Sequence, residues 1–125
     1  MKKDETKLWL KLKSQKCKIT WTRIENSAAH GTPDVLGYNK NHIFFTVELK
    51  VTKRNKISFS PHQIAFHFKH PKRTFLLVEE QQKVLGQRPI KLYEGAAVQA
   101  LVGGAHPPPV ACGLSACCLL LENLT

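Results

Sequence analysis

The chain is short of acidic residues, and this shortage narrows the class of its partner. Its 125 residues include 19 Lys and Arg but only 9 Asp and Glu, which gives a formal net charge of +10 at pH 7. No acid occurs from residue 49 to residue 74, where basic side chains accumulate. This excess favours a polyanion such as nucleic acid over an acidic metabolite. The alternative is a basic protein whose lysines are simply solvated.

Long apolar runs are also missing. The longest, residues 117–121, is too short to cross a bilayer, and charged residues rather than an apolar segment follow the initial methionine. We therefore expect no membrane partner and a cytoplasmic location, that of the host cell if the protein is phage-encoded.

Cysteine is sparse and unevenly placed. Of the four, Cys17 stands alone, and Cys112, Cys117 and Cys118 fall in the last fourteen residues without a Cys-x-x-Cys spacing. This pattern predicts free thiols. It favours neither disulfides nor a zinc site that would include His106.

The length suits one domain, and the pattern of apolar residues predicts a mixture of helices and strands. Helices are expected at 4–14, 61–69 and 96–102, and strands at 18–25, 34–38, 43–51, 74–78 and 90–93. From residue 103 onward the composition becomes rich in Gly and Pro and then apolar, with a small helix at 114–121. We interpret residues 1–102 as the domain and residues 103–125 as a tail.

The few acids in the middle of the chain are grouped. Glu25, Asp34 and Glu48 are the only ones between Glu5 and Glu79. Divalent cations such as Mg²⁺ bind hard oxygen ligands, so a cluster of carboxylates within a cationic chain indicates a metal site.

Strand periodicity predicts that part of this cluster converges. In a hairpin that turns near residues 39–42, position 34 lies opposite position 48, and successive side chains of a strand point to opposite faces. Glu48 and Lys50 should therefore project side by side next to Asp34. The intervening apolar side chains, Phe45, Val47 and Leu49, should enter the core.

Each of these residues also has a purely structural interpretation. Glu48 and Lys50 could form an ordinary salt bridge on a solvated strand, and an Asp after Pro is often a turn residue. Gln63 follows Ser60 with the spacing of a capping box at the start of a helix.

Four motifs in order carry a family resemblance: RIEN at 23–26, GTPDV at 31–35, FFTVELKV at 44–51 and SPHQIAFH at 60–67. Together they resemble the PD-(D/E)XK nuclease superfamily over about residues 5–102. The likeness is greatest to its small phage-type and VRR-NUC-like members, which include enzymes of the Holliday-junction-resolvase kind. The resemblance implies an α/β fold of the restriction-endonuclease type, with a central mixed β-sheet flanked by helices, and a metal-dependent DNA endonuclease.

The resemblance also assigns the metal ligands. Asp34, Glu48 and the backbone carbonyl of Leu49 would bind Mg²⁺ or Mn²⁺, and Glu25 would complete the site directly or through water. Some relatives supply the first acid from the N-terminal helix, so Glu5 competes with Glu25. We favour Glu25, which lies in the RIE motif close to the hairpin.

The remaining roles follow from the same motifs and from charge. Lys50 would orient or help to deprotonate the attacking water, and Gln63 would support water, metal or substrate. The side chains expected to contact nucleic acid are Lys53, Arg54, Lys56, His62 and Lys69. We expect His67 and His70 to be solvated on the helix surface, with phosphate contact as the alternative.

Two other function classes stay open at this point. The favoured reading is a structure-selective or nicking endonuclease on branched or single-stranded DNA, a chemistry for which small relatives often pair as symmetric homodimers. The alternatives are a non-catalytic basic nucleic-acid-binding module and a subunit of a larger nucleic-acid-processing complex.

Overall fold

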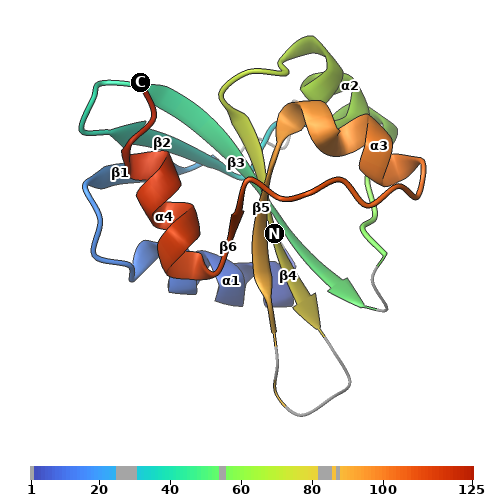
Figure 1. Ribbon diagram of the computed structural model, residues 1–125, viewed down its shortest axis with the longest axis horizontal. Coiled ribbons are helices and arrows are strands. Elements are labelled where there is room, and N and C mark those ends of the chain that lie inside the picture. The colour runs from blue at the N-terminus through green and yellow to red at the C-terminus, as the bar shows by residue number, and fades with distance from the viewer. Residues whose placement is uncertain (1, 25–30, 54–55, 82–85, 87) are drawn as a thin grey trace.

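A six-stranded sheet forms the centre of the protein. The computed structural model describes residues 2–24, 31–53, 56–81, 86 and 88–125, with the side chain of Lys53 excepted (Figure 1). Two residues of the predicted site, Glu25 and Arg54, therefore lie outside the described part of the chain. The strands are β1 (Ile19–Arg23), β2 (Val35–Asn39), β3 (Phe44–Lys53), β4 (Thr74–Gln81), β5 (Ile90–Glu94) and β6 (Ala111–Cys112). The helical elements are α1 (Lys3–Lys13), α2 (Pro61–Lys69), the 3-10 helix η1 (Gly95–Ala97), α3 (Val98–Val102) and α4 (Leu114–Glu122).

The strands lie in the order in which they occur in the chain, β1 to β6. Only β3 and β4 run parallel, and the other neighbours are antiparallel. A parallel pair needs a crossover connection, which α2 supplies here. The predicted α/β class with a central mixed sheet is confirmed. Strands β3 and β4 continue past their predicted ends, because they still pair at Thr52↔Glu80 and Lys53↔Gln81. These residues carry no apolar pattern from which the sequence could predict a strand.

Alternation along the strands divides the core into two layers. Phe45, Val47 and Leu49 of β3 belong to one buried cluster with Leu8 and Leu12 of α1, as the strand periodicity predicted. On the opposite face, Leu76 and Val78 of β4 pack with residues of α2 and α3. Figure 1 accordingly shows α1 and α4 apart from the α2 and α3 pair. We call the second layer the α2 face.

The C-terminal segment is part of this core. Strand β6 pairs with β5. In α4, Cys117, Cys118 and Leu121 belong to the same buried cluster as the apolar residues of α1. Asn39 fixes the helix end by donating from Nδ2 to the carbonyl oxygens of Leu121 and Leu124, each 3.0 Å away. The compositional boundary after residue 102 therefore does not separate this segment from the packed domain. Sequence reasoning missed the strand because two residues are too few to show a period.

The four cysteines are free thiols in the described structure, as predicted. Within the same residues, the helices are too short or too polar to span a membrane.

The packing of α4 predicts unequal effects of two leucine truncations on one helix. Leu121 is fully buried, whereas Leu119 is 62% exposed. We expect Leu121→Ala to lower the free energy of unfolding by about 2–5 kcal/mol, because it leaves a cavity in the core. Leu119→Ala should change it by less than about 0.5 kcal/mol. Urea unfolding measures both, and equal losses would contradict the described position of the helix.

Candidate active site

The site begins where β2 stops pairing with β3. Their antiparallel register ends at Val35↔Val47, while β3 continues beside β4 to Lys53. One side of β3 is thus without a paired strand from Glu48 onward in the described structure. The side chain of Asp34 takes that place, since the Leu49 N–H donates to Asp34 Oδ2 at 2.8 Å. In an extended strand the N–H and C=O of one residue point the same way, so the Leu49 carbonyl faces this edge too.

The segment before β2 is held against the start of α2. Gly31 has a φ of +82°, and a Cβ there would collide with the backbone carbonyl of His62. Only glycine fits both the left-handed conformation and the close approach. This contact brings the 31–34 segment, and with it Asp34, toward the first turn of α2.

Gln63 links the helix start to the acids. Its backbone N–H donates to Ser60 Oγ at 3.2 Å, and its Oε1 accepts from the Ser60 N–H at 3.0 Å, which completes the predicted capping box. The same Oε1 accepts from Lys50 Nζ at 2.9 Å, and Nε2 donates to Glu48 Oε1. The side-chain amide that closes the capping box therefore also contacts Lys50 and Glu48.

Lys50 is further positioned by an aromatic ring. Its Nζ lies 5.1 Å from the centroid of Phe59, within the range of a cation–π interaction. Sequence reasoning missed Phe59, because its place beside Lys50 depends on the path of the segment between β3 and α2 and no spacing rule encodes it.

Glu48 is the most perturbed acid of the group. It is 2% exposed, and its Oε2 is buried without a hydrogen-bond partner in the part of the chain that the structure describes. Burial raises its pKa to about 9, the Asp34 carboxylate adds to this, and Lys50 opposes it. A hydrogen bond between the two carboxyl groups, which also raises the pKa, requires a proton shared between them. When both are ionised, Oε2 is left with no donor.

These side chains line one hollow of about 570 Å³. We call it the acidic hollow. It brings together the predicted Asp34, Glu48, Lys50 and Gln63, and it also contains Lys2 and Glu5 from the start of α1. Glu5, one of the two candidates for the first acid, thus lies at the site. The other candidate, Glu25, is outside the described residues.

The acids at the hollow do not make up a full set of metal ligands within the described residues. In the described part of the chain, no group of three or more His, Cys, Asp and Glu side chains is arranged to hold a metal. Asp34 and Glu48 supply two carboxylates, and the Leu49 carbonyl supplies a neutral oxygen. A third acid would have to come from Glu5 or from Glu25.

The described residues predicted to contact nucleic acid do not line this hollow. Lys56, His62 and Lys69 are exposed. His62 lies in the first turn of α2, beside Gln63, whereas Lys69 ends the helix, about 10 Å further along its axis. Lys53 belongs to β3, and its side chain is among the parts not described.

The prediction that His67 is solvated on the helix surface is wrong. This residue is 1% exposed instead of solvated, and it packs beside Thr74 and Gly95, where a Cβ would collide with Thr74. Burial lowers its pKa to about 4, with smaller contributions from the charges of Lys50 and His70. His67 is therefore neutral at pH 7 and belongs to the packing beneath the site. His70 is exposed, as expected.

Comparison with known proteins adds no relative: no protein-family model matches the chain, and no curated protein matches it significantly.

The raised pKa of Glu48 predicts a pH-dependent stability of the metal-free protein. Because its folded pKa is about 9 against an ordinary 4.5, the folded state holds a proton that the unfolded state has lost between these values. Stability should be full below about pH 4.5 as far as Glu48 is concerned. It should then fall as pH rises toward 9, by at most about 1.4 kcal/mol per pH unit.

Urea unfolding in EDTA across this pH range measures the slope. Glu48→Gln, which stays neutral, should flatten it, whereas Glu122→Gln on the opposite layer should not. A parent and a Glu48→Gln variant with identical pH slopes would rule out this role of Glu48.

Proposed function

We propose that this protein is a metal-dependent endonuclease that hydrolyses phosphodiester bonds in DNA, with a restriction-endonuclease-like fold of the PD-(D/E)XK kind. The observation that carries the proposal is the meeting of Asp34, Glu48, Lys50 and Gln63 in one hollow at the open edge of β3. This grouping combines cation ligands with a fixed ammonium group, and it lies in a chain with a net charge of +10.

The residues present fit a hard divalent cation. Two carboxylates face one another, and the buried Oε2 of Glu48 has no hydrogen-bond donor. A cation beside it would satisfy that oxygen and remove the repulsion between the two acids. Asp34, Glu48 and the Leu49 carbonyl would hold the ion, together with Glu5 or Glu25. When bound, Mg²⁺ or Mn²⁺ would promote ionisation of water and neutralise charge on the phosphate.

Hydrolysis consumes one water molecule. Its oxygen bonds to phosphorus, the bond from phosphorus to one sugar oxygen breaks, and the protons pass to the leaving oxygen and to solvent. Negative charge grows on the phosphate during this exchange. Lys50 is placed to stabilise it, because one of its three N–H donors binds Gln63 and the others are available for a phosphate oxygen or the attacking water.

Gln63 acts through its neighbours in this proposal. Its carbonyl oxygen accepts from Lys50 while its amide nitrogen donates to Glu48, so the orientation of the amide fixes both side chains. Ser60 locks that orientation through the capping bond. Gln63 is thus a positioning residue for Glu48 and Lys50.

The substrate side of the proposal rests on charge. We propose branched or single-stranded DNA in the cytoplasm as the target, because the net charge of +10 favours contacts with the phosphate backbone, which do not read the base sequence. A symmetric homodimer would allow two strands to be cut.

A cleavage panel tests the assignment. Plasmid, duplex, single strand, flap and four-way junction are incubated with Mg²⁺, Mn²⁺ or EDTA. We expect metal-dependent cleavage of at least one substrate. Glu48→Gln and Lys50→Ala should each reduce its rate at least about 100-fold. Salt-sensitive DNA binding should survive in both variants.

A matched acid and lysine elsewhere provide the control. Lys40 and Glu122 form an ion pair of 3.7 Å outside the site. Lys40→Ala and Glu122→Gln should leave the cleavage rate within about twofold of the parent, since neither side chain lines the acidic hollow. Equal rates for Glu48→Gln and the parent would remove the catalytic assignment. DNA binding without cleavage on any substrate would instead support the non-catalytic module.

A further inference from the structure

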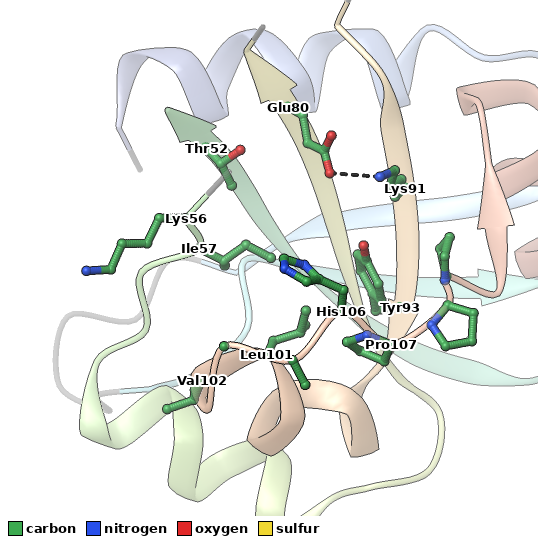
Figure 2. Close-up of a pocket in the computed structure, with 14 residues that line it drawn as sticks. Thr52, Lys56, Ile57, Glu80, Lys91, Tyr93, Leu101, Val102, His106 and Pro107 are labelled. Carbon is green, nitrogen blue, oxygen red and sulfur yellow. Dashed lines mark ion pairs between the residues drawn. The ribbon is translucent and has the colours of Figure 1, made fainter. Parts of the chain in front are cut away.

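A second hollow on the α2 face lies beside the acidic hollow and has no role in the proposed hydrolysis. It has a volume of about 550 Å³, in the range of about 300–1,000 Å³ typical of ligand sites. Side chains of β3, β4 and β5 form one wall, and the end of α3 with residues 104–109 forms the other (Figure 2). We call it the tail pocket, because residues 104–109 belong to the C-terminal segment.

A third hollow, of about 410 Å³, connects these two. It shares Lys2 and Lys50 with the acidic hollow, and it shares Thr52 and Lys56 with the tail pocket. The three hollows therefore follow β3 from Glu48 to Thr52, about 13 Å along an extended strand. The lining of the connecting hollow combines Lys2, Lys50 and Lys56 with Asp4 and Glu5. Its three ammonium groups would hold the phosphates of a strand that runs from the acidic hollow toward the tail pocket.

The tail pocket combines apolar and polar surface, and the polar part is the larger. Tyr93, Leu101 and Pro107 supply apolar surface, and Figure 2 shows them around the cavity. Glu80 and Lys91 form an ion pair of 3.0 Å at the strand wall. An acceptor and a donor thus stand side by side next to apolar surface.

A buried hydroxyl adds an independent sign of a ligand. Thr52 is 3% exposed and lines the pocket, and among the described residues its Oγ1 has no hydrogen-bond partner. Buried polar groups are normally paired, so an orphan hydroxyl at a cavity wall indicates a missing partner. Thr52 pairs in register with Glu80, which places both on the same wall.

The chemistry of the pocket selects its occupant. A phosphate would compete with Glu80 for Lys91 and would leave the apolar side chains without contacts, and an aliphatic side chain would leave Thr52 and the ion pair without further partners. A nucleobase satisfies both parts, because it has a flat apolar face and an edge of hydrogen-bond donors and acceptors.

We propose that the tail pocket receives the base of an unpaired nucleotide next to the phosphodiester that is cut. This inference rests on the proposed endonuclease function. The nucleotide must be unpaired, because a base stacked in a duplex cannot enter a concave pocket. Glu80 would accept from a base amino group and Lys91 would donate to a base carbonyl. Guanine and cytosine carry both groups and should be preferred over adenine and thymine.

The test uses a flap substrate, whose branch point fixes the register of the single strand. The base is removed at one flap position after another, and both cleavage by the parent and metal-free binding by Glu48→Gln are measured. We expect one or two adjacent positions at which loss of the base weakens binding about 5- to 100-fold. Guanine or cytosine at those positions should give the tightest binding.

Two variants assign the effect to the pocket. Ala105 is exposed on the pocket rim, so Ala105→Trp should fill the cavity and abolish the dependence on the base. It is made in the parent to measure cleavage and in the Glu48→Gln background to measure binding. Ala116, exposed on α4, is the matched control, and Ala116→Trp should change nothing. Glu80→Gln keeps the shape of the pocket and should reduce the preference for guanine and cytosine.

The outcomes separate the two proposals. Cleavage that is insensitive to base removal and to Ala105→Trp would overturn the tail pocket while the endonuclease stands. Absence of cleavage, with base-dependent binding that Ala105→Trp removes, would overturn the endonuclease and retain the pocket as a site for an unpaired base. Free nucleoside monophosphates that bind as tightly as the flap would show a mononucleotide site and overturn the proposed strand ligand.

Discussion

The architecture of the site depends on one interrupted strand pairing. Had β2 continued beside β3, the backbone of Leu49 would be engaged in a ladder and Asp34 would have no room at this edge. Because the pairing ends at Val47, the Asp34 carboxylate accepts the Leu49 N–H instead. Glu48, which follows Val47 in β3, is buried and lies close to the Asp34 carboxylate as a result. Burial, reinforced by the charge of Asp34, raises its pKa, and within the described residues its Oε2 has no hydrogen-bond partner.

Next to this pair, one side-chain amide connects the central lysine of the site to the buried acid. The first turn of α2 presents Gln63, whose two ends hold Lys50 and Glu48. The glycine at position 31 presses the segment before β2 onto the same turn. The site is therefore built from short contacts among three neighbouring segments, with the core of the sheet as rigid support. A hydrolytic centre requires such preorganisation, because charge stabilisation falls when the groups must reorient.

The parts that could be predicted from sequence are those governed by local rules. Alternation placed Phe45, Val47 and Leu49 in the core, the hairpin count placed Asp34 opposite Glu48, and the Ser60 capping pattern gave the start of α2. The parts that could not be predicted depend on contacts between distant segments. His67 looked like a surface residue because the packing of η1 and β4 over it has no signature in α2 itself. Phe59, Thr52 and the position of Glu5 are of the same kind, and the contest between Glu5 and Glu25 involves a residue outside the described part of the chain.

The course of the C-terminal segment has a consequence for dissecting this protein. After α3 it borders the α2 face, adds β6 at the edge of the sheet, and then crosses to pack α4 against the opposite layer. The family-like motifs end well before it, so a fragment cut at residue 102 would look complete by motif. Such a fragment would expose the edge of β5 and the apolar surface beneath α4, two features that promote aggregation. Here the region that carries the recognisable pattern and the region that folds as a unit have different boundaries.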